Sequence, residues 1–353
     1  MKKHIITILA LTVTIAAHAQ NFQPVDRWLD DNAAKMGGRV MLMVYKDGQM
    51  VYSHSVNNMN MAQKMAGRMM AHRMGQTPNF DDYTASTRQP MASCSKWFSA
   101  ALVMTFVDEG KLKLTDTVGK YLPVLSQHGK GSITISQCLS HLTGIKAPEL
   151  RESMADMRKA QDMDDAINQI AWQPIEGAPG TVFHYSNDGL QIAGAIIEKI
   201  SGKSFETLFA ERIARPLEMK DTDFGKGPVA LPAGGAGSTP NDYMNFLEMI
   251  LNKGTFKGKR ILSEKSIGEM QVNRLSPAVK IGYSPVEAGN FGYGYGEWVM
   301  GNLSVTSPGL FGSFPLVDNQ RHYAAFLMCV YIKNDGRNER YKELKNLLDS
   351  VLK

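Results

Sequence analysis

The chain has 353 residues, of which 43% are hydrophobic and 21% are charged, a balance typical of a globular protein with a sizeable core. Its net charge of +5 is small for this length. It does not point to the concentrated basic face that nucleic-acid binding needs, so we expect no nucleic-acid partner. Only three cysteines are present, without CxxC, HExxH or a His/Cys cluster, so the sequence predicts no structural zinc site and no cofactor.

Residues 1–19 have the pattern of a secretory signal peptide. Lys2 and Lys3 precede an apolar run, and Ala17-His18-Ala19 is an A-x-A cleavage site. The run is shorter than the roughly 20 residues that span a bilayer, and no cysteine near the cleavage site offers a lipid anchor. We therefore expect export across the inner membrane, a periplasmic location and no stable membrane anchor.

The first structured segments are a helix and a hairpin. The stretch PVDRWLDDNAAKMG predicts a short helix that ends at a glycine. The following stretch, RVMLMVYKDGQMVYSHSV, predicts two strands joined by a turn at Asp47-Gly48, because Asp-Gly is a strong signal for a two-residue hairpin turn.

Residues 57–74 are unusually rich in methionine among basic residues. Three of these methionines are four residues apart and could share a helical face. One interpretation is a Cu(I) site, because thioethers suit that soft ion. The commoner alternative is a flexible insertion or lid packed with adaptable side chains. The methionines are Met59, Met61, Met65, Met69, Met70 and Met74.

The middle of the chain, from residue 97 to about 226, is predicted to be mostly helical. The segment WFSAALVMTFVDEG is apolar nearly all round, as in a buried helix. A second helix opens with Thr134 and Gln137 spaced as a capping box and closes at Gly144. A third apolar helix, DGLQIAGAIIEKIS, closes at Gly202.

The last third returns to strands, with a helix at each end. A helix starts with Thr239 as N-cap, Pro240 at its first position and Asp242 completing a capping box. Strands are predicted in FGYGYGEWVMG, NLSVTSPG and HYAAFLMCVYI, followed by a final amphipathic helix from residue 340.

This order predicts one domain over residues 20–353. Strands at both chain ends form one antiparallel sheet flanked by helices, and an all-helical region is inserted between them. The α/β part covers about 20–90 and 227–353, and the helical part about 91–226. Nothing in the sequence indicates a particular oligomeric state.

The stretch SCSK contains the spacing S-x-x-K between Ser93 and Lys96. Residues three apart on a helix differ by only about 60°, so the amine can reach the hydroxyl. A serine needs a base to become a nucleophile, and a buried lysine can be that base. Ser95 points away from Lys96, and Cys94 has no neighbouring histidine. The alternative is an N-cap followed by a solvated lysine.

A second short motif is Tyr185-Ser186-Asn187, at the start of a helix. A tyrosine there could relay protons between Ser93, Lys96 and a leaving group. Asn187 could bond a substrate amide or orient Lys96. The alternative is a buried tyrosine beside a helix cap.

Four more side chains lie near these motifs. His141 comes late in a helix and is interpreted as a capping or packing residue, while His184 either modulates the site or lines the cleft. Tyr295 and Trp298 are expected to alternate in one strand, where they form a wall of the pocket or pack in the core.

Taken in order, several stretches resemble the serine β-lactamase and penicillin-binding protein superfamily. The resemblance is to its class C-like branch, which also contains esterases, D-amino-acid peptidases and amide hydrolases. It extends from about Asn21 to the C-terminus and is poorest over residues 57–85. The stretches are ASCSKWFSAALVMTFVDEGKLKLTDTVGKYLP, ITISQCLSHLTGI, YSNDGLQIAGAIIEKISGKSF, GAGSTPNDYMNFLEMILNKGTFKGKRIL and YGYGEWV.

The resemblance implies a β-lactamase/transpeptidase-like fold with the site between an α/β part and a helical part. It implies that Ser93 forms an acyl-enzyme and that Lys96 and Tyr185 share general base and acid duties. Asn187 would contact substrate, and the amides of Ser93 and Leu310 would form the oxyanion hole.

The chain departs from the family at the third motif, a strand carrying Lys or His followed by x-Gly. The best candidate is Ser307-Pro308-Gly309. Serine brings no charge for a substrate carboxylate, and proline removes a backbone donor. Gly309 still permits close approach of substrate, and Arg321 is a candidate to supply the missing charge. The change argues against a proficient β-lactamase or D-Ala-D-Ala carboxypeptidase.

The sequence therefore favours an exported serine hydrolase that cleaves an ester or amide bond of a small molecule or peptide. The alternative is a catalytically weak penicillin-binding or sensor-type pseudoenzyme of the same fold. An α/β-hydrolase is disfavoured because the chain has no G-x-S-x-G motif.

Overall fold

The computed structural model describes residues 20–73, 75, 77–148, 159–301, 303–333 and 335–353. The predicted signal peptide lies outside these residues. Within the described part of the chain, no helix combines the length and hydrophobicity needed to span a membrane.

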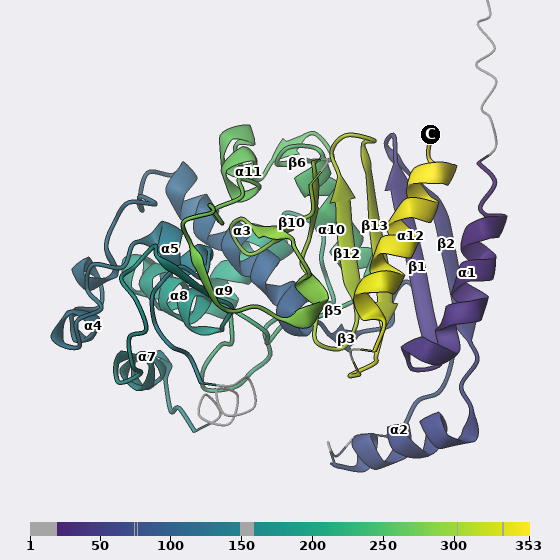
Figure 1. Ribbon diagram of the computed structural model, residues 1–353, viewed down its shortest axis with the longest axis horizontal. Coiled ribbons are helices and arrows are strands. Elements are labelled where there is room, and N and C mark those ends of the chain that lie inside the picture. Colours follow the sequence, from purple (N-terminus) through teal and green to yellow (C-terminus); the bar gives the residue numbers. More distant parts are fainter. Residues whose placement is uncertain (1–19, 74, 76, 149–158, 302, 334) are drawn as a thin grey trace, which may run out of the picture.

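A seven-stranded antiparallel sheet forms the centre of the α/β part (Figure 1). Its order is β2-β1-β13-β12-β11-β10-β9, so strands from the start of the chain join strands from its end. The junction is the pairing of β1 with β13, which runs in register from Val40↔Cys329 to Lys46↔Tyr323. This confirms the predicted sheet built from both chain ends. The strands are β1 Arg39–Lys46, β2 Gln49–Asn57, β9 Gly292–Tyr293, β10 Trp298–Val299, β11 Ser304–Thr306, β12 Phe314–Asp318 and β13 Tyr323–Cys329.

Helices cover both faces of this sheet. Because side chains alternate along a strand, Leu42 of β1 faces one side and Met41 the other. The first side is covered by α1 (Gln23–Ala33) and α12 (Arg337–Val351), which form one apolar cluster with it. The second side packs on α3 (Ser95–Asp108) and α10 (Pro240–Leu251).

The inserted region is largely helical, as predicted. Its core is continuous with that of α3 and the sheet, so one large apolar cluster joins the two parts. The prediction that this region is all-helical is wrong at β4 (Val182–His184), which pairs in parallel with β8 (Lys280–Tyr283). The helices are α4 Pro123–Gln127, α5 Ile135–Leu139, α7 Met163–Ala171, α8 Asp188–Ser201 and α9 Phe205–Phe209.

Smaller elements complete the fold. The pair β3 (Gln89–Pro90) and β5 (Gly237–Ser238) fixes the chain just before α3. Helix α2 (Met61–Arg73) lies at the edge of the molecule, beyond the ends of β1 and β2 (Figure 1). The remaining strands and α-helix are β6 Thr255–Phe256, β7 Lys259–Arg260 and α11 Glu264–Met270.

Candidate active site

Ser93 lies in a short 3-10 turn, Ala92–Cys94, directly before the buried helix α3. Ala92 has a φ of 45°, a left-handed conformation that is uncommon for alanine. Backbone bonds fix the turn: the Met91 amide donates to the Ala236 carbonyl at 2.8 Å, and the Cys94 amide donates to the Met91 carbonyl at 3.1 Å. The surrounding structure therefore holds the nucleophile candidate in a constrained backbone position.

Lys96 lies one helical turn further, and its side chain is 1% exposed. Its Nζ is 3.2 Å from Ser93 Oγ, 3.2 Å from Asn187 Oδ1 and 2.8 Å from the Ala233 carbonyl oxygen. Burial lowers the pKa of Lys96 to about 7. When the amine is neutral, its two N–H groups can serve Asn187 and Ala233, which leaves the lone pair facing Ser93 Oγ. The geometry thus suits a general base beside a serine.

The two neighbours of Ser93 have structural contacts instead. Ser95 Oγ accepts a hydrogen bond from the Ala236 amide at 3.0 Å. Cys94 Sγ donates to the Ser313 carbonyl at 3.6 Å, and burial raises the pKa of its thiol, which keeps it protonated. Among the three candidates in SCSK, Ser93 is the one directed at Lys96.

The structure also brings Tyr185 and Asn187 to Ser93 and Lys96. The Tyr185 ring centroid is 4.8 Å from Lys96 Nζ, and the ring stacks on Trp298 at 5.2 Å. Asn187 is the N-cap residue of α8, so the helix start carries its amide oxygen to Lys96. All four residues predicted for the chemistry therefore lie together.

The positions of the two histidines that flank the site differ in part from those expected. His141 lies just beyond the end of α5, with a φ of 58°, rather than late in the helix. It packs on Tyr185 at 4.6 Å between ring centroids, and its Nε2 is 3.0 Å from Tyr293 Oη. Burial, followed by the nearby charge of Lys96, lowers its pKa well below the usual value. A neutral His141 thus supports the tyrosine ring. His184, by contrast, is held by Glu176 at 2.6 Å.

The expectation that Tyr295 and Trp298 alternate in one strand is wrong. Only Trp298 lies in β10; Tyr295 lies in the preceding turn and bonds Ser136 at 2.7 Å. The glycines of GYGYG cause the break, because Gly296 has a φ of 74° and a Cβ there would lie 2.5 Å from the Lys96 carbonyl oxygen. Tyr293, which our sequence reasoning missed, contacts the site instead.

Ser307 lies directly after β11, and its side chain does not face an open site. It is 2% exposed, and its Oγ is 3.0 Å from the Gly296 carbonyl oxygen and 3.3 Å from that of Ser93. A hydroxyl has a single proton to donate, so this proton is directed at backbone oxygens. The residue ties β11 to the turn that carries the nucleophile candidate.

The next residues of the third motif also pack against that turn. A Cβ on Gly309 would lie 2.5 Å from the Met91 carbonyl oxygen and 3.1 Å from Cys94 Sγ, so only glycine fits. The Gly309 amide donates to Ser313 at 2.9 Å. Leu310 follows directly and is partly exposed. The pairing of its amide with that of Ser93 as an oxyanion hole stays a prediction.

The suggestion that Arg321 replaces the missing cation is wrong. The antiparallel pairing Ser304↔Asp318 places the turn after β12 at the opposite end of β11 from Ser307. The Arg321 amide donates to Asp318 at 2.7 Å, and its guanidinium lies 3.7 Å from Asp349 of α12. This charge therefore serves the sheet–helix interface.

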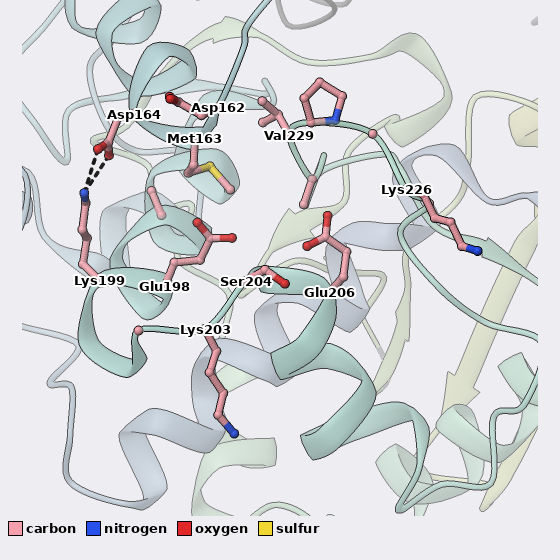
Figure 2. A pocket seen from close by; sticks show the side chains of 16 residues that line it. Asp162, Met163, Asp164, Glu198, Lys199, Lys203, Ser204, Glu206, Lys226 and Val229 are labelled. Carbon is pink, nitrogen blue, oxygen red and sulfur yellow. Dashed lines mark hydrogen bonds and ion pairs between the residues drawn. The ribbon is translucent and has the colours of Figure 1, made fainter.

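A separate hollow of about 700 Å³ lies at the end of α8 (Figure 2). It is lined by charged side chains such as Glu198, Glu206 and Lys199, the last paired with Asp164 at 2.8 Å. None of Ser93, Lys96, Tyr185 and Asn187 lines it, so we do not assign it to the same chemistry. Nor do the described residues contain a group of three or more His, Cys, Asp or Glu side chains placed to hold a metal ion.

Comparisons with known proteins agree with this fold. The profile of the Beta-lactamase family matches residues 25–340. The solved structure of a β-lactamase candidate from Bacteroides dorei DSM 17855 superposes with a TM-score of 0.77 at 25% identity, over 94% of this chain and 99% of that one.

Two curated relatives match part of the chain. Protein flp of Staphylococcus aureus (strain MW2) is 29% identical over 142 residues, 39% of this chain. A candidate D-alanyl-D-alanine carboxypeptidase of Escherichia coli (strain K12) is 26% identical over 216 residues, 59% of this chain. The matches span 28% and 48% of the lengths of these two relatives.

Proposed function

The chain belongs to the β-lactamase family, whose members are serine hydrolases, and we propose that it cleaves an ester or amide bond through an acyl-enzyme at Ser93. One observation carries the proposal. A fully buried lysine amine, with its pKa lowered to about 7, lies 3.2 Å from the Ser93 hydroxyl. Such an amine is neutral in a useful fraction near neutral pH and can remove the serine proton.

The proposed reaction has two halves. Ser93 Oγ attacks the substrate carbonyl carbon while its proton passes to Lys96 Nζ, and a tetrahedral oxyanion forms. The oxyanion is stabilised by the amides of Ser93 and Leu310. Collapse breaks the bond to the leaving group, which takes a proton from the Lys96–Tyr185 pair. Water then attacks the acyl carbon and gives up its proton to the same pair; the bond to Ser93 Oγ breaks, the pair returns the proton to Oγ, and the acid is released.

The proposed substrate is a small molecule or peptide without a carboxylate at the third-motif position. Ser307 carries no charge, and its proton is directed at the Gly296 and Ser93 carbonyl oxygens. A carboxylate there would lose water and gain no charge from Ser307 in return, which is costly. Esters and neutral amides avoid that cost. We further propose that the protein acts after export, in the periplasm, on the strength of its first 19 residues.

The test is intact-mass analysis of wild type and Ser93→Ala with three probes. These are a p-nitrophenyl ester, a chromogenic cephalosporin and a D-Ala-D-Ala peptide. We expect a mass increase of one acyl group on wild type and sustained turnover of the ester, both lost in Ser93→Ala. A folded wild-type protein that forms no adduct with any probe would refute the proposal.

The second candidate is a penicillin-binding or sensor-type pseudoenzyme. The uncharged third motif favours this pseudoenzyme. The motif positions substrate in the family, so its change could impair turnover while leaving acylation of Ser93 intact. It predicts an acyl-enzyme that forms and persists without turnover. Sustained release of product from any ester or amide, dependent on Ser93, would exclude it.

A further inference from the structure

Helix α2 carries a row of exposed methionines. Met61, Met65 and Met69 are 69%, 57% and 59% exposed. At 100° per residue the three lie within an arc of about 80°. The exposed His72 falls inside the same arc, one turn after Met69. The row therefore places three thioethers and an imidazole on one outward strip of the helix.

The rest of the molecule holds α2 through residues outside the row. A Cβ on Gly67 would lie 2.9 Å from the Phe80 ring, and the Arg68 guanidinium lies 5.7 Å from that ring's centroid. Gln63 Nε2 donates to the Ala34 carbonyl at 2.7 Å. These contacts fix the helix without using the methionine row. The exposure of the row argues against the interpretation that its methionines are packing residues.

The chemistry of the row selects a soft ion. Neighbours at i and i+4 have Cβ atoms about 5–6 Å apart, so adjacent thioethers can converge on one ion. Residues 61–73 contain no Asp or Glu, so hard cations such as Ca²⁺ and Mg²⁺ find no carboxylate. Lys64 and Arg68 lie nearby and repel a divalent ion more than a monovalent one.

We propose that Met61, Met65, Met69 and His72 form a binding site for a soft monovalent metal ion, Cu(I) or its analogue Ag(I). Thioether and imidazole ligands both suit Cu(I). A membrane surface is the less favoured occupant, because interfacial helices use Trp, Phe and Leu, and α2 has none of these. The site is separate from the hydrolytic centre and does not depend on it.

The test measures the affinity of the full chain for Cu(I) under anaerobic conditions, against a chromogenic Cu(I) chelator. The variant is Met61→Leu/Met65→Leu/Met69→Leu, which keeps apolar volume and removes sulfur from exposed positions. The control is Met50→Leu, a methionine that is 42% exposed on β2 and outside the row.

We expect wild type and Met50→Leu to bind one Cu(I) and the triple variant to lose about 100-fold or more in affinity. Copper X-ray absorption should show sulfur neighbours that disappear in the triple variant, and Ag(I) should follow the same pattern without a reductant. Equal affinity of wild type and triple variant would overturn the proposal and point to the buried thiols. The metal-free protein could instead sediment with phosphatidylglycerol vesicles, and the triple variant could fail to do so. That result would overturn the metal-site proposal in favour of a membrane surface.

Discussion

Two walls meet at Ser93, and they use their polar atoms in opposite ways. The α3 wall consists of α3, the start of α8 and the loop at residues 230–236; there Lys96 Nζ reaches Ser93, Asn187 and Ala233. The β11 wall consists of residues 296 and 307–310; there the Ser307 hydroxyl turns back to the carbonyl oxygens of Gly296 and Ser93.

This difference between the two walls places the groups for the proposed bond-breaking on one wall and those for substrate recognition on the other. The α3 wall has a buried amine, an oriented amide and a tyrosine ring within contact of the amine, which are the groups that the proposed acylation needs. The β11 wall supplies packing and backbone but no charge. Under the proposed function, the chain would keep the capacity to acylate, and the uncharged Ser307 would change which acyl donors it accepts.

Removing the nucleophile should have the largest effect. Ser93→Ala should lower kcat/KM for an activated ester by about 10⁴-fold or more, because the proposed acyl bond forms on Ser93 Oγ. Stopped-flow or steady-state ester hydrolysis measures it. Ser95→Ala is the matched control: its hydroxyl accepts the Ala236 amide, so acylation should persist. Equal losses in the two variants would contradict the assignment of Ser93.

Removing the base should cost less. Lys96→Met should lower kcat/KM by about 10³-fold, within the range for a general base. It should also leave the protein at least as stable, because a lysine whose pKa falls from 10.5 to about 7 on folding opposes folding below pH 10.5. The control is Lys130→Met, a second buried lysine, which donates to Ala171. Activity that survives in Lys96→Met would assign the base to Tyr185.

The pH profile should show a smaller, graded effect. The active lysine is the neutral form, so kcat/KM for a neutral ester should rise about tenfold per pH unit below 7 and level off above it. In Lys96→Met this rise should disappear. A wild-type rate that falls as pH increases through 7 would mean that the protonated lysine is the active form.

A substitution in the β11 wall should have the smallest effect on activity. Ser307→Ala should cost about 1 kcal/mol of stability, the value of one buried hydrogen bond, and only about threefold in ester turnover. Thermal unfolding and kcat/KM measure the two effects. Ser304→Ala, which loses a bond to Asp318 at the other end of the same strand, is the stability control. A loss above about 100-fold at Ser307 would place its hydroxyl on substrate and remove the contrast between the walls.

Local chemistry made much of the fold predictable. The hairpin at Asp47-Gly48 and the capping box of Thr134 and Gln137 form as expected. Long-range contacts changed the capping box predicted at the start of α10. Thr239 caps α10, but the Asp242 carboxylate accepts from the Asp221 amide and Thr222 instead of closing the box.

Strand β12 escaped prediction because Pro315 lies within it, and a proline usually argues against a central strand. The contacts of the site also divide into local ones, which the sequence predicts, and long-range ones, which it does not. Ser93 ends up one turn before Lys96, where the 3-10 turn Ala92–Cys94 runs directly into α3, so their spacing alone brings them together. The Ala233 oxygen arrives from 137 residues away and is a backbone atom, which no residue type signals. The contact of His141 with Tyr185 likewise depends on how α5 packs beside α8.

The pairing of β1 with β13 has a consequence for the order of folding. Strand β1 is made early and its partner is made among the last elements, so the central ladder closes only when nearly the whole chain is present. Pairing between such distant segments forms slowly. A chain emerging from the ribosome would keep β1 and β2 without their partner for most of synthesis. If the chain is exported as proposed, that delay would keep it in a form that can still be threaded through a channel.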